Sequence, residues 1–474
     1  MGEKLEVDVC VIGGGSGGLT VAAATAMLGR PVALVEAGKM GGDCLNYGCV
    51  PSKSLIAAAR HAAMARRAGD FGVELGEPRA DFARVRDHVR GIIAGIAPHD
   101  SQERFEGLGC TVIRAAGRFV GPDELAAGDA RIRARRFIIA TGSSPSVPPI
   151  PGLAETPYLT NETIFDLDTR PDHLIVIGGG PIGMELAQAQ RRLGARVSVI
   201  EMASLLANDD PEAAAVVRAA VMREGVALHE ETKLLRVERQ GTGIAVTVEN
   251  SGRESRIAGS HLLVATGRRP NLEGLGLDAA GVAYSKTGVV VDRHLRTSNR
   301  RIYAIGDAVG PYQFTHLAAH HAGIVVRNVL FRLPAKVDER ALPWVTYTDP
   351  ELAHVGLVEA KARERHGAIR ILRWSFAEND RARTERDTTG FAKIVATKRG
   401  RVLGATIVGA HAGELIAPWG LAIARGIKMS ALAGLIVPYP TRSEISKSAA
   451  GSFYTSSLFS ERTKKLVRFL ARFG

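Results

Sequence analysis

Two cysteines, Cys44 and Cys49, stand close together in a glycine-rich segment of the chain. Thiols at this spacing can close a small disulfide loop if the backbone turns between them, and such a pair can accept and release electrons. The spacing also suits an inert reduced pair or half of a zinc site. Zinc needs four ligands, and the remaining cysteines, Cys10 and Cys110, supply no second cluster. Because a dinucleotide-binding turn precedes the pair, we favour a redox-active pair beside a bound flavin or nicotinamide.

The turn near the amino terminus predicts the first dinucleotide site. An apolar strand over residues 9–12 precedes it, an alanine-rich helix runs to Leu28, and a second strand over residues 32–35 ends in an acid. Glycines permit the close approach of a pyrophosphate, and the helix amino terminus offers it free N–H groups. A carboxylate after the second strand can accept hydrogen bonds from ribose hydroxyls. The residues concerned are Gly13, Gly15, Gly18 and Glu36.

The same unit recurs 165 positions later in the chain. A strand over residues 175–177 leads into a second glycine-rich turn, and a strand over residues 197–200 again ends in glutamate. One such motif is weak evidence, but two copies with their acids in register indicate two dinucleotide sites. The alternative is two glycine turns in an unrelated α/β protein. The second set is Gly178, Gly180, Gly183 and Glu201.

Composition limits the class of protein. The chain has 474 residues, of which 46% are hydrophobic, which predicts two to four domains. Four cysteines are too few for a secreted disulfide scaffold, and we find neither a signal-peptide pattern nor the ~18 uncharged residues that span a bilayer. We therefore expect a cytoplasmic protein. The net charge of +12 favours anionic ligands such as dinucleotides, and no motif indicates a nucleic-acid partner.

Residues 41–53 carry a long and specific pattern, GGDCLNYGCVPSK. It resembles the active-site segment of the pyridine nucleotide-disulfide oxidoreductases, the family of dihydrolipoamide dehydrogenase, glutathione reductase and mercuric reductase. The resemblance extends over roughly residues 7–455. It implies an α/β fold with two Rossmann-like dinucleotide-binding domains, for FAD and NAD, and an α+β dimerisation domain. It also implies a homodimer whose active site is shared between the subunits.

The resemblance implies domain boundaries as well. Two similar turns, Thr141-Gly142 and Thr266-Gly267, follow strands where family members pass between flavin and nucleotide domains. The segment ending in Asp307 resembles the second flavin motif, in which the aspartate contacts the ribityl chain, although Gly-Asp after a strand can also be an ordinary turn. The expected parts are residues 1–150 and 271–340 for the two parts of the FAD domain, 151–270 for the NAD domain, and 341–474 for the dimerisation domain with its basic tail.

The order of the two units assigns their cofactors. The cysteine pair follows the first unit closely, so we expect FAD there and the nicotinamide nucleotide in the second, as the resemblance also implies. A carboxylate at Glu201 accepts from a free 2′-hydroxyl and repels a 2′-phosphate, and residues 202–206 contain no arginine, which predicts NADH rather than NADPH. Arg191, Arg192 and Arg196 lie nearby in the sequence. The FAD set is Gly13, Gly15, Gly18, Glu36, Lys53, Thr141, Gly142 and Asp307; the NAD set is Gly178, Gly180, Gly183, Glu201 and Gly267.

The resemblance further implies roles for side chains around the cysteines. Cys49 is expected to be the thiolate next to the flavin, and Cys44 the sulfur that attacks the substrate, because a thiol is a poor nucleophile until it is deprotonated. Lys53 would stabilise negative charge on the flavin or a thiolate, and Glu185 is the partner of that lysine in the family. Judged by position alone, Lys53 also suits a solvated helix, and Glu185 the amino end of a helix.

The sequence departs from the disulfide reductases of the family near its carboxyl end. Tyr439 stands where they carry the histidine base of a His-Pro-x-x-x-Glu motif, whereas Glu444 is retained. A phenol with a pKa of about 10 is a poor base at neutral pH. We therefore expect weak activity on dihydrolipoamide or glutathione disulfide. The leading interpretation is an FAD-containing, NADH-dependent dithiol oxidoreductase. A mercuric-reductase-like metal reductase is the first alternative, although those enzymes add a carboxy-terminal cysteine pair and this chain has no cysteine after Cys110.

The tail, residues 460–474, is basic and amphipathic. Apolar residues recur at helical spacing, and Lys464, Lys465, Arg468 and Arg472 take other faces. The pattern suits a helix that packs on the dimer, or one that docks on an anionic membrane or an acidic protein. Together with Tyr439, the tail leaves open a redox-sensing or electron-relay protein whose partner is another protein.

Overall fold

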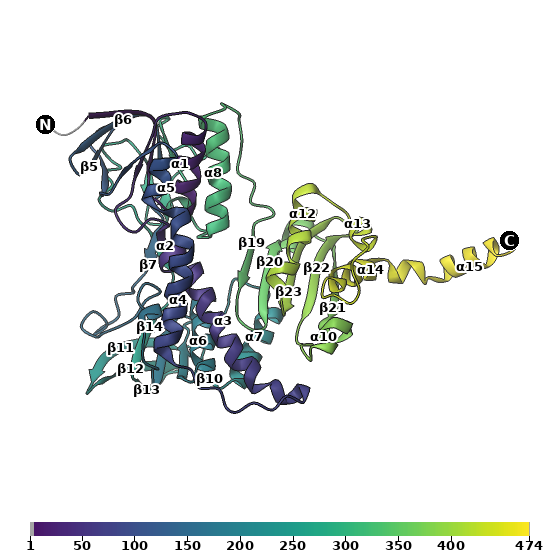
Figure 1. Ribbon diagram of the computed structural model, residues 1–474. Coiled ribbons are helices and arrows are strands. Elements are labelled where there is room, and N and C mark those ends of the chain that lie inside the picture. The colour runs from purple at the N-terminus through teal and green to yellow at the C-terminus, as the bar shows by residue number, and fades with distance from the viewer. Residues whose placement is uncertain (1–3, 474) are drawn as a thin grey trace. The chain divides into compact units, whose positions relative to one another are not determined.

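The computed structural model describes residues 4–473 and contains two compact units (Figure 1). The first unit contains the chain up to Met202 together with Glu231–Val337. The second contains Ala203–Glu230 and the chain from Asp338 onward. The mixture of parallel α/β layers with a separate antiparallel sheet agrees with the expected fold class.

The first unit is built on a seven-stranded sheet in the order β3-β2-β1-β6-β5-β4, with β18 paired to β6. The central strands β1, β2, β3, β6 and β18 run parallel, as expected for strands of continuous apolar sequence that are buried on both faces. Helices α1 and α8 pack side by side against one face (Figure 1). The strands are β1 (Lys4–Ile12), β2 (Val32–Val35), β3 (Cys110–Ile113), β4 (Gly117–Phe119), β5 (Glu124–Ala127), β6 (Ala130–Ile139) and β18 (Ile302–Ala304), and the helices α1 (Ser16–Met27) and α8 (Thr315–Val329).

The second parallel layer of this unit repeats the first on a smaller scale. Strand β8 (His173–Ile177) lies between β9 (Arg196–Ile200) and β14 (His261–Val264), and α6 (Pro181–Arg192) connects β8 to β9. A three-stranded antiparallel sheet adds β11 (Lys233–Gln240), β12 (Gly243–Asn250) and β13 (Arg253–Gly259). Two pairs of short strands complete the unit, β7 (Ser143–Pro145) with β15 (Arg268–Pro270) and β16 (Tyr284–Ser285) with β17 (Gly288–Val289).

The sequence predicts one helix over residues 53–70 and a second, charged helix over residues 81–105, and the limits of both differ in the structure. The helix expected over residues 53–70 is α3 (Cys49–Arg66), which begins at the second cysteine, and α2 (Gly42–Asn46) precedes it. The helix expected over residues 81–105 is divided into α4 (Phe82–Ile96) and α5 (Gln102–Gly107). Pro98 lies in the interruption, where a residue without an N–H cannot continue the helical hydrogen bonds.

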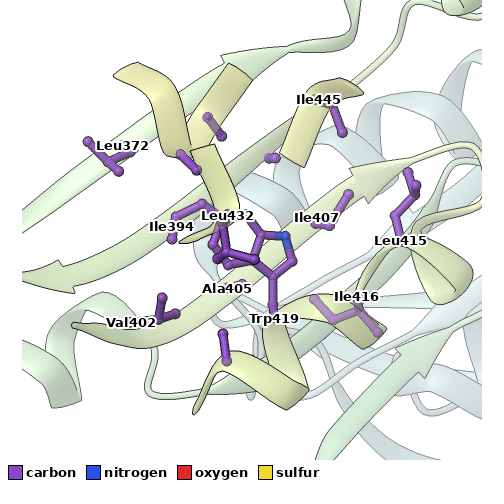
Figure 2. Packing of buried hydrophobic residues seen from close by; sticks show 14 of the residues in the cluster. Leu372, Ile394, Val402, Ala405, Ile407, Leu415, Ile416, Trp419, Leu432 and Ile445 are labelled. Carbon is purple, nitrogen blue, oxygen red and sulfur yellow. The ribbon is translucent and has the colours of Figure 1, made fainter. Parts of the chain in front are cut away.

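The second unit has a five-stranded antiparallel sheet in the order β19-β20-β23-β22-β21. Trp419 is fully buried beside this sheet among apolar side chains from the strands and from the following helices (Figure 2), and its indole N–H donates to Ser446 at 3.0 Å. The strands are β19 (Pro343–Thr346), β20 (Glu351–Gly356), β21 (Ile369–Ser375), β22 (Phe391–Thr397) and β23 (Val402–Gly409). The remaining elements are α7 (Pro211–Arg223), β10 (Val226–His229), α9 (Glu359–His366), α10 (Asp380–Thr384), α11 (Ala412–Leu415), α12 (Ala417–Arg425), α13 (Met429–Ala433), α14 (Glu444–Leu458) and α15 (Glu461–Leu470).

Candidate redox site and nucleotide sites

The two cysteines lie on successive short helices of the first unit. Cys44 is in α2, and Cys49 opens α3, with Gly48 between the helices as the N-cap. A Cβ at Gly48 would approach Asp43 Oδ2 to 2.8 Å and Asp43 O to 3.1 Å, so glycine lets the chain turn closely here. Both cysteines are free thiols, and a hydrogen bond joins their side chains. The turn that the sequence required between the cysteines is thus a helix–glycine–helix corner.

The environment makes the two sulfurs chemically different. The hydrogen bond from Cys44 lowers the pKa of Cys49 to about 6, with further help from the Thr315 hydroxyl and the Lys53 ammonium. Thr315 Oγ1 lies 3.3 Å from Cys49 Sγ, at the start of α8. The same hydrogen bond, together with burial, raises the pKa of Cys44 well above its usual range. At neutral pH Cys49 is therefore the thiolate of the pair, and Cys44 keeps its proton.

Lys53 lies one helical turn after Cys49 and forms an ion pair with Glu185. Lys53 Nζ is 2.8 Å from Glu185 Oε2, and the carboxylate side chain is only 6% exposed. Residues i and i+4 share a helix face, so Lys53 points to the same side of α3 as Cys49. Glu185 comes from α6, the helix that follows the second glycine turn. The ion pair therefore fixes the position of the cation that acts on the thiolate.

The first glycine turn has the shape that a dinucleotide pyrophosphate requires. Gly13 has a φ of +113°, and a Cβ there would lie 2.2 Å from Ala140 O. A Cβ at Gly18 would lie 1.9 Å from Gly13 O, so this glycine lets the helix lie against the turn. Gly15 is the N-cap of α1, whose first turn has neither an acid nor a side-chain cap. Glu36 accepts from Gly14 N at 2.5 Å and holds the loop at the end of β2.

Three further groups gather at the carboxyl ends of β6 and β18, next to this turn. The Thr141 hydroxyl is buried and has no hydrogen-bond partner among residues 4–473. Gly142, with a φ of +68°, turns the chain after it. Asp307 accepts from the Ser143 hydroxyl at 2.6 Å, and burial raises the pKa of its carboxyl group. An orphaned hydroxyl and a buried carboxyl beside a glycine cradle fit a polar cofactor such as FAD.

The second glycine turn reproduces the first in detail. Gly178 has a φ of +110°, and a Cβ there would lie 2.4 Å from Ala265 O. A Cβ at Gly183 would again meet the carbonyl of the first glycine, at 1.9 Å, and Gly180 is the N-cap of α6. Glu201 accepts from Gly179 N at 2.7 Å. Gly267, with a φ of +104°, has open space around it.

The arginines near Glu201 in sequence make contacts within the fold. Arg191 donates to Ala195 O, and Arg196 donates to Asp172 O. Arg192 is largely buried. Arg191 and Arg196 are thereby attached to backbone carbonyls of the fold.

Tyr439 and Glu444 belong to the second unit. The Tyr439 phenol is 71% exposed and donates to Asp380 Oδ2 at 3.1 Å. The hydrogen bond to Asp380 and the negative charge of that carboxylate raise the pKa of Tyr439, so the phenol stays protonated at neutral pH and cannot accept a proton there. Glu444 opens α14 and accepts from Thr441 N at 3.4 Å.

Sequence reasoning assigned no role to three residues that the structure brings to the cysteine segment and to Asp307. Thr315 contacts Cys49 across 266 positions. Arg268 pairs with Asp43 at 3.0 Å and donates to Ser143, which in turn donates to Asp307. No local pattern marks Thr315 or Ser143, and Arg268 followed a recognised turn without a motif of its own.

Residues 7–322 match the pyridine nucleotide-disulphide oxidoreductase family, and residues 342–450 match the dimerisation domain of that family. The chain belongs to this family. It is 37% identical to mercuric reductase of Streptomyces lividans over 454 residues, which cover 94% of this chain and 96% of that protein. It is 34% identical to dihydrolipoyl dehydrogenase of Geobacillus stearothermophilus, over 94% of this chain and 96% of that protein. The Cu(II) complex of the HOCl-induced flavoprotein disulfide reductase RclA from Escherichia coli has a similar structure, with a TM-score of 0.85 and 27% sequence identity. The match covers 94% of this chain and 99% of that protein.

Family membership confirms the main functional predictions. The chain is a flavin-dependent oxidoreductase of the disulfide reductase type, and members of the family use FAD and NAD(P)H. The dimerisation domain supports a homodimer. Among residues 4–473, no helix is both long and apolar enough to cross a membrane. The same residues contain no group of three or more His, Cys, Asp or Glu side chains that could hold a metal ion.

Proposed function

We propose that this enzyme takes electrons from NADH and delivers them through the Cys44–Cys49 pair to a disulfide or a soft metal ion. The observation that carries the proposal is the opposite shift of the two thiol pKa values, which gives a Cys49 thiolate near Lys53 and a protonated Cys44. Bound FAD would supply hydride acceptance from the nicotinamide and electron delivery to sulfur. Residues 1–150 and 271–340 would form its domain, and residues 151–270 the NADH domain.

The side chains around the pair support the reduced state. Lys53 and Thr315 stabilise the negative charge of Cys49 after the disulfide opens. Glu185 keeps the lysine in place through their ion pair. Cys44 retains the proton and is the sulfur that attacks an acceptor once that proton leaves. Re-formation of the Cys44–Cys49 disulfide then releases two electrons to the acceptor.

The acceptor is constrained by Tyr439. A phenol whose pKa is raised by Asp380 does not take the proton of an incoming dithiol at neutral pH. This favours acceptors that need no such base, and a soft metal ion bound by the two sulfurs is one of them. The 37% identity to a mercuric reductase and the likeness to the Cu(II) complex of a flavoprotein disulfide reductase support the same class. The two-electron balance is closed by oxidation of the dithiol to the disulfide and reduction of Hg(II) to Hg(0).

Anaerobic turnover with separate acceptors tests the proposal. The full-length, FAD-loaded enzyme is given NADH and either Hg(II), Cu(II), lipoamide or a small disulfide, and NADH loss is followed. We expect faster turnover with the metal ions than with lipoamide, and loss of both activities in Cys49→Ser. Rapid turnover of lipoamide would refute the argument from Tyr439. Fast flavin reduction with slow turnover of every acceptor would indicate a redox-sensing or relay protein.

Glu201 supports NADH as the electron donor. The residue directly follows β9, and its carboxylate accepts from the glycine turn, an arrangement that suits a group accepting hydrogen bonds from the ribose hydroxyls of a bound nucleotide. A 2′-phosphate would meet this negative charge. The ratio of kcat/KM for NADH and NADPH tests the preference, and a ratio below one would contradict it.

Helix α15 supports docking on an anionic membrane surface. It has no buried residue, and Leu466, Val467, Phe469 and Leu470 are each more than half exposed. Lys464, Lys465 and Arg468 provide positive charge on the same helix, and each basic residue near an anionic bilayer contributes about 1 kcal/mol. α15 lies beyond the region that matches the dimerisation domain. Gly474, the last residue of the tail, lies outside the described residues.

Co-sedimentation with vesicles tests the membrane proposal. We expect the full-length enzyme to bind vesicles that contain phosphatidylglycerol and not vesicles of phosphatidylcholine alone. Leu466→Asp with Leu470→Asp should abolish binding, while Arg253→Gln with Arg399→Gln, two exposed arginines elsewhere, should not. If deletion of residues 460–474 leaves vesicle binding unchanged, or converts a dimer to a monomer, the helix has another role.

A further inference from the structure

A cavity lined by arginines lies in the first unit, at the end of the sheet opposite to the cofactor loops. It has a volume of about 520 Å³, within the range of sites that hold small ligands. Five of its wall residues are arginines, and its wall contains no carboxylate. The five arginines are Arg135, Arg136, Arg296, Arg300 and Arg332, and Tyr303 also lines the cavity.

The position of this cavity separates it from the FAD residues. Gly13, Thr141 and Asp307 follow the carboxyl ends of β1, β6 and β18, which run parallel. Arg136 immediately precedes Phe137, the β6 residue that pairs with the first residue of β18, and Arg300 precedes β18 itself. Both arginines therefore lie toward the amino end of this strand pair. Arg136 and Thr141 are five positions apart in the chain, or about 16 Å at the usual rise per strand residue. An anion in the cavity would therefore not occupy the pyrophosphate site.

Most of the positive charge in the cavity is not neutralised by the protein. Arg135 is paired with Asp8, at 2.5 Å, and also donates to Val329 O. The other four arginines make no ion pair with a carboxylate of residues 4–473. Burial lowers the pKa of Arg136, and the neighbouring charge of Arg135 lowers it further. Collecting like charges in this way costs free energy that a bound anion would recover.

The fold holds Arg296 and the backbone of the loop that carries Arg332 in place before any ligand arrives. Arg296 Nε donates to the buried Tyr303 hydroxyl at 3.2 Å. The two terminal amino groups of the guanidinium take no part in this hydrogen bond. Asn328 ties together the two loops that carry Arg296 and Arg332, because its amide nitrogen donates to His294 O and Ala335 O and its oxygen accepts from Ala335 N. Arg332 itself has a φ of +53°, a conformation that non-glycine residues rarely adopt.

We propose that this cavity binds a small anion that carries several phosphate groups. The planar guanidinium matches two oxygens of a phosphate at once, and several arginines around one space select a ligand with clustered charge over a single carboxylate. Anion binding at this site does not depend on the identity of the electron acceptor, so the site can be tested separately from the proposed reaction. A nucleic acid is the competing occupant.

Isothermal titration of the FAD-loaded, full-length enzyme with sodium tripolyphosphate tests the site. The titration is made at 0.15 M salt in the presence of saturating NAD⁺, which keeps the probe from the nucleotide site. We expect one saturable site per chain. Arg300→Gln with Arg332→Gln should weaken binding at least about tenfold, because two phosphate contacts are lost. Arg253→Gln with Arg399→Gln removes the same charge from exposed positions outside the cavity and should change affinity less than about twofold.

The outcomes are separable. NADH oxidation by the Arg300→Gln, Arg332→Gln enzyme should equal that of the unchanged enzyme, which shows that the fold and the redox site survive. Absence of saturable tripolyphosphate binding would overturn the proposal, and so would an equal loss in both double variants. Tighter binding of a single-stranded oligonucleotide, lost only in the cavity variant, would assign the arginines to nucleic acid instead.

Discussion

Lys53 and Glu185 connect, through an ion pair of 2.8 Å, the helix that begins with Cys49 to the helix that follows the second glycine turn. The cysteine chemistry and the nucleotide-binding layer are thereby joined by one buried carboxylate. A lysine placed by its own flexible chain would act weakly on the thiolate. Held by Glu185, its charge stays on the face of α3 that carries Cys49, and it helps to lower the pKa of Cys49.

Removal of this charge should therefore change the acidity of the sulfur. In Lys53→Met the pKa of Cys49 is expected to rise, because a cation that favours the thiolate is lost. The measurement is the rate of iodoacetamide alkylation of the reduced enzyme at pH 7, which should fall several-fold. Lys398→Met, at an exposed turn between β22 and β23, is the matched control and should leave the rate unchanged. An equal rate in Lys53→Met would show that the ion pair has only a structural role.

The reactivity of the pair should follow the pKa of Cys49. Because this pKa is lowered to about 6, the thiolate is present above that pH and alkylation should decline as the pH falls through it. In Cys44→Ala the midpoint should move upward, since the hydrogen bond from Cys44 is the largest cause of the lowering. Thr315→Val should move it in the same direction by less. A midpoint near the ordinary thiol value of about 8.5 in the unchanged enzyme would contradict this account.

The first glycine turn should be required for flavin binding. Gly13→Ala would put a methyl group 2.2 Å from Ala140 O at a φ of +113°. We expect the purified variant to lose its flavin absorbance near 450 nm. Gly29→Ala is the control, because Gly29 also has a positive φ but meets nothing within 4 Å of a Cβ. It should retain flavin with a stability loss of about 1 kcal/mol. Full flavin content in Gly13→Ala would place FAD elsewhere.

Nucleotide choice should depend on Glu201. In Glu201→Ala the loss of a carboxylate hydrogen bond should reduce kcat/KM for NADH by about tenfold, and removal of its charge should improve NADPH. Glu201 also holds Gly179 N, so the melting temperature and flavin content of the variant are measured in parallel. Unchanged selectivity in a folded variant would remove Glu201 from the ribose site.

Tyr439 should limit dithiol chemistry. Tyr439→His places a base with a pKa near 6.5 at this position and is expected to raise lipoamide turnover. Tyr439→Phe removes only the hydrogen bond to Asp380 and should leave lipoamide turnover low. Higher lipoamide activity in Tyr439→Phe than in Tyr439→His would contradict a base role for this position. Stability should change little in either variant, since the side chain is exposed.

The elements that could be predicted from the sequence are those whose residues are neighbours in the chain. Each glycine turn, with its strand, helix and terminal glutamate, is contained in about thirty residues, and local sterics dictate its geometry. The two copies therefore appear in the structure with the same clashes, at Gly18 and Gly183, that only glycine avoids. Helix limits were less predictable, because the start of α3 at Cys49 depends on the corner at Gly48 and not on periodicity.

The sequence by itself determined the family, the two dinucleotide units and the chemical identity of the cysteine pair, because each of these is a short run of residues with a fixed spacing. Tertiary structure alone decided that Thr315 contacts Cys49, that Arg268 and Ser143 reach Asp307, and that five arginines surround one cavity. The contacts of Thr315 with Cys49, of Arg268 with Ser143 and of Ser143 with Asp307 each join residues more than a hundred positions apart, and the cavity brings residues 135 and 136 together with arginines from residues 296–332. Their distances are set by the packing of parallel strands and their helices, so no local pattern in the chain records them.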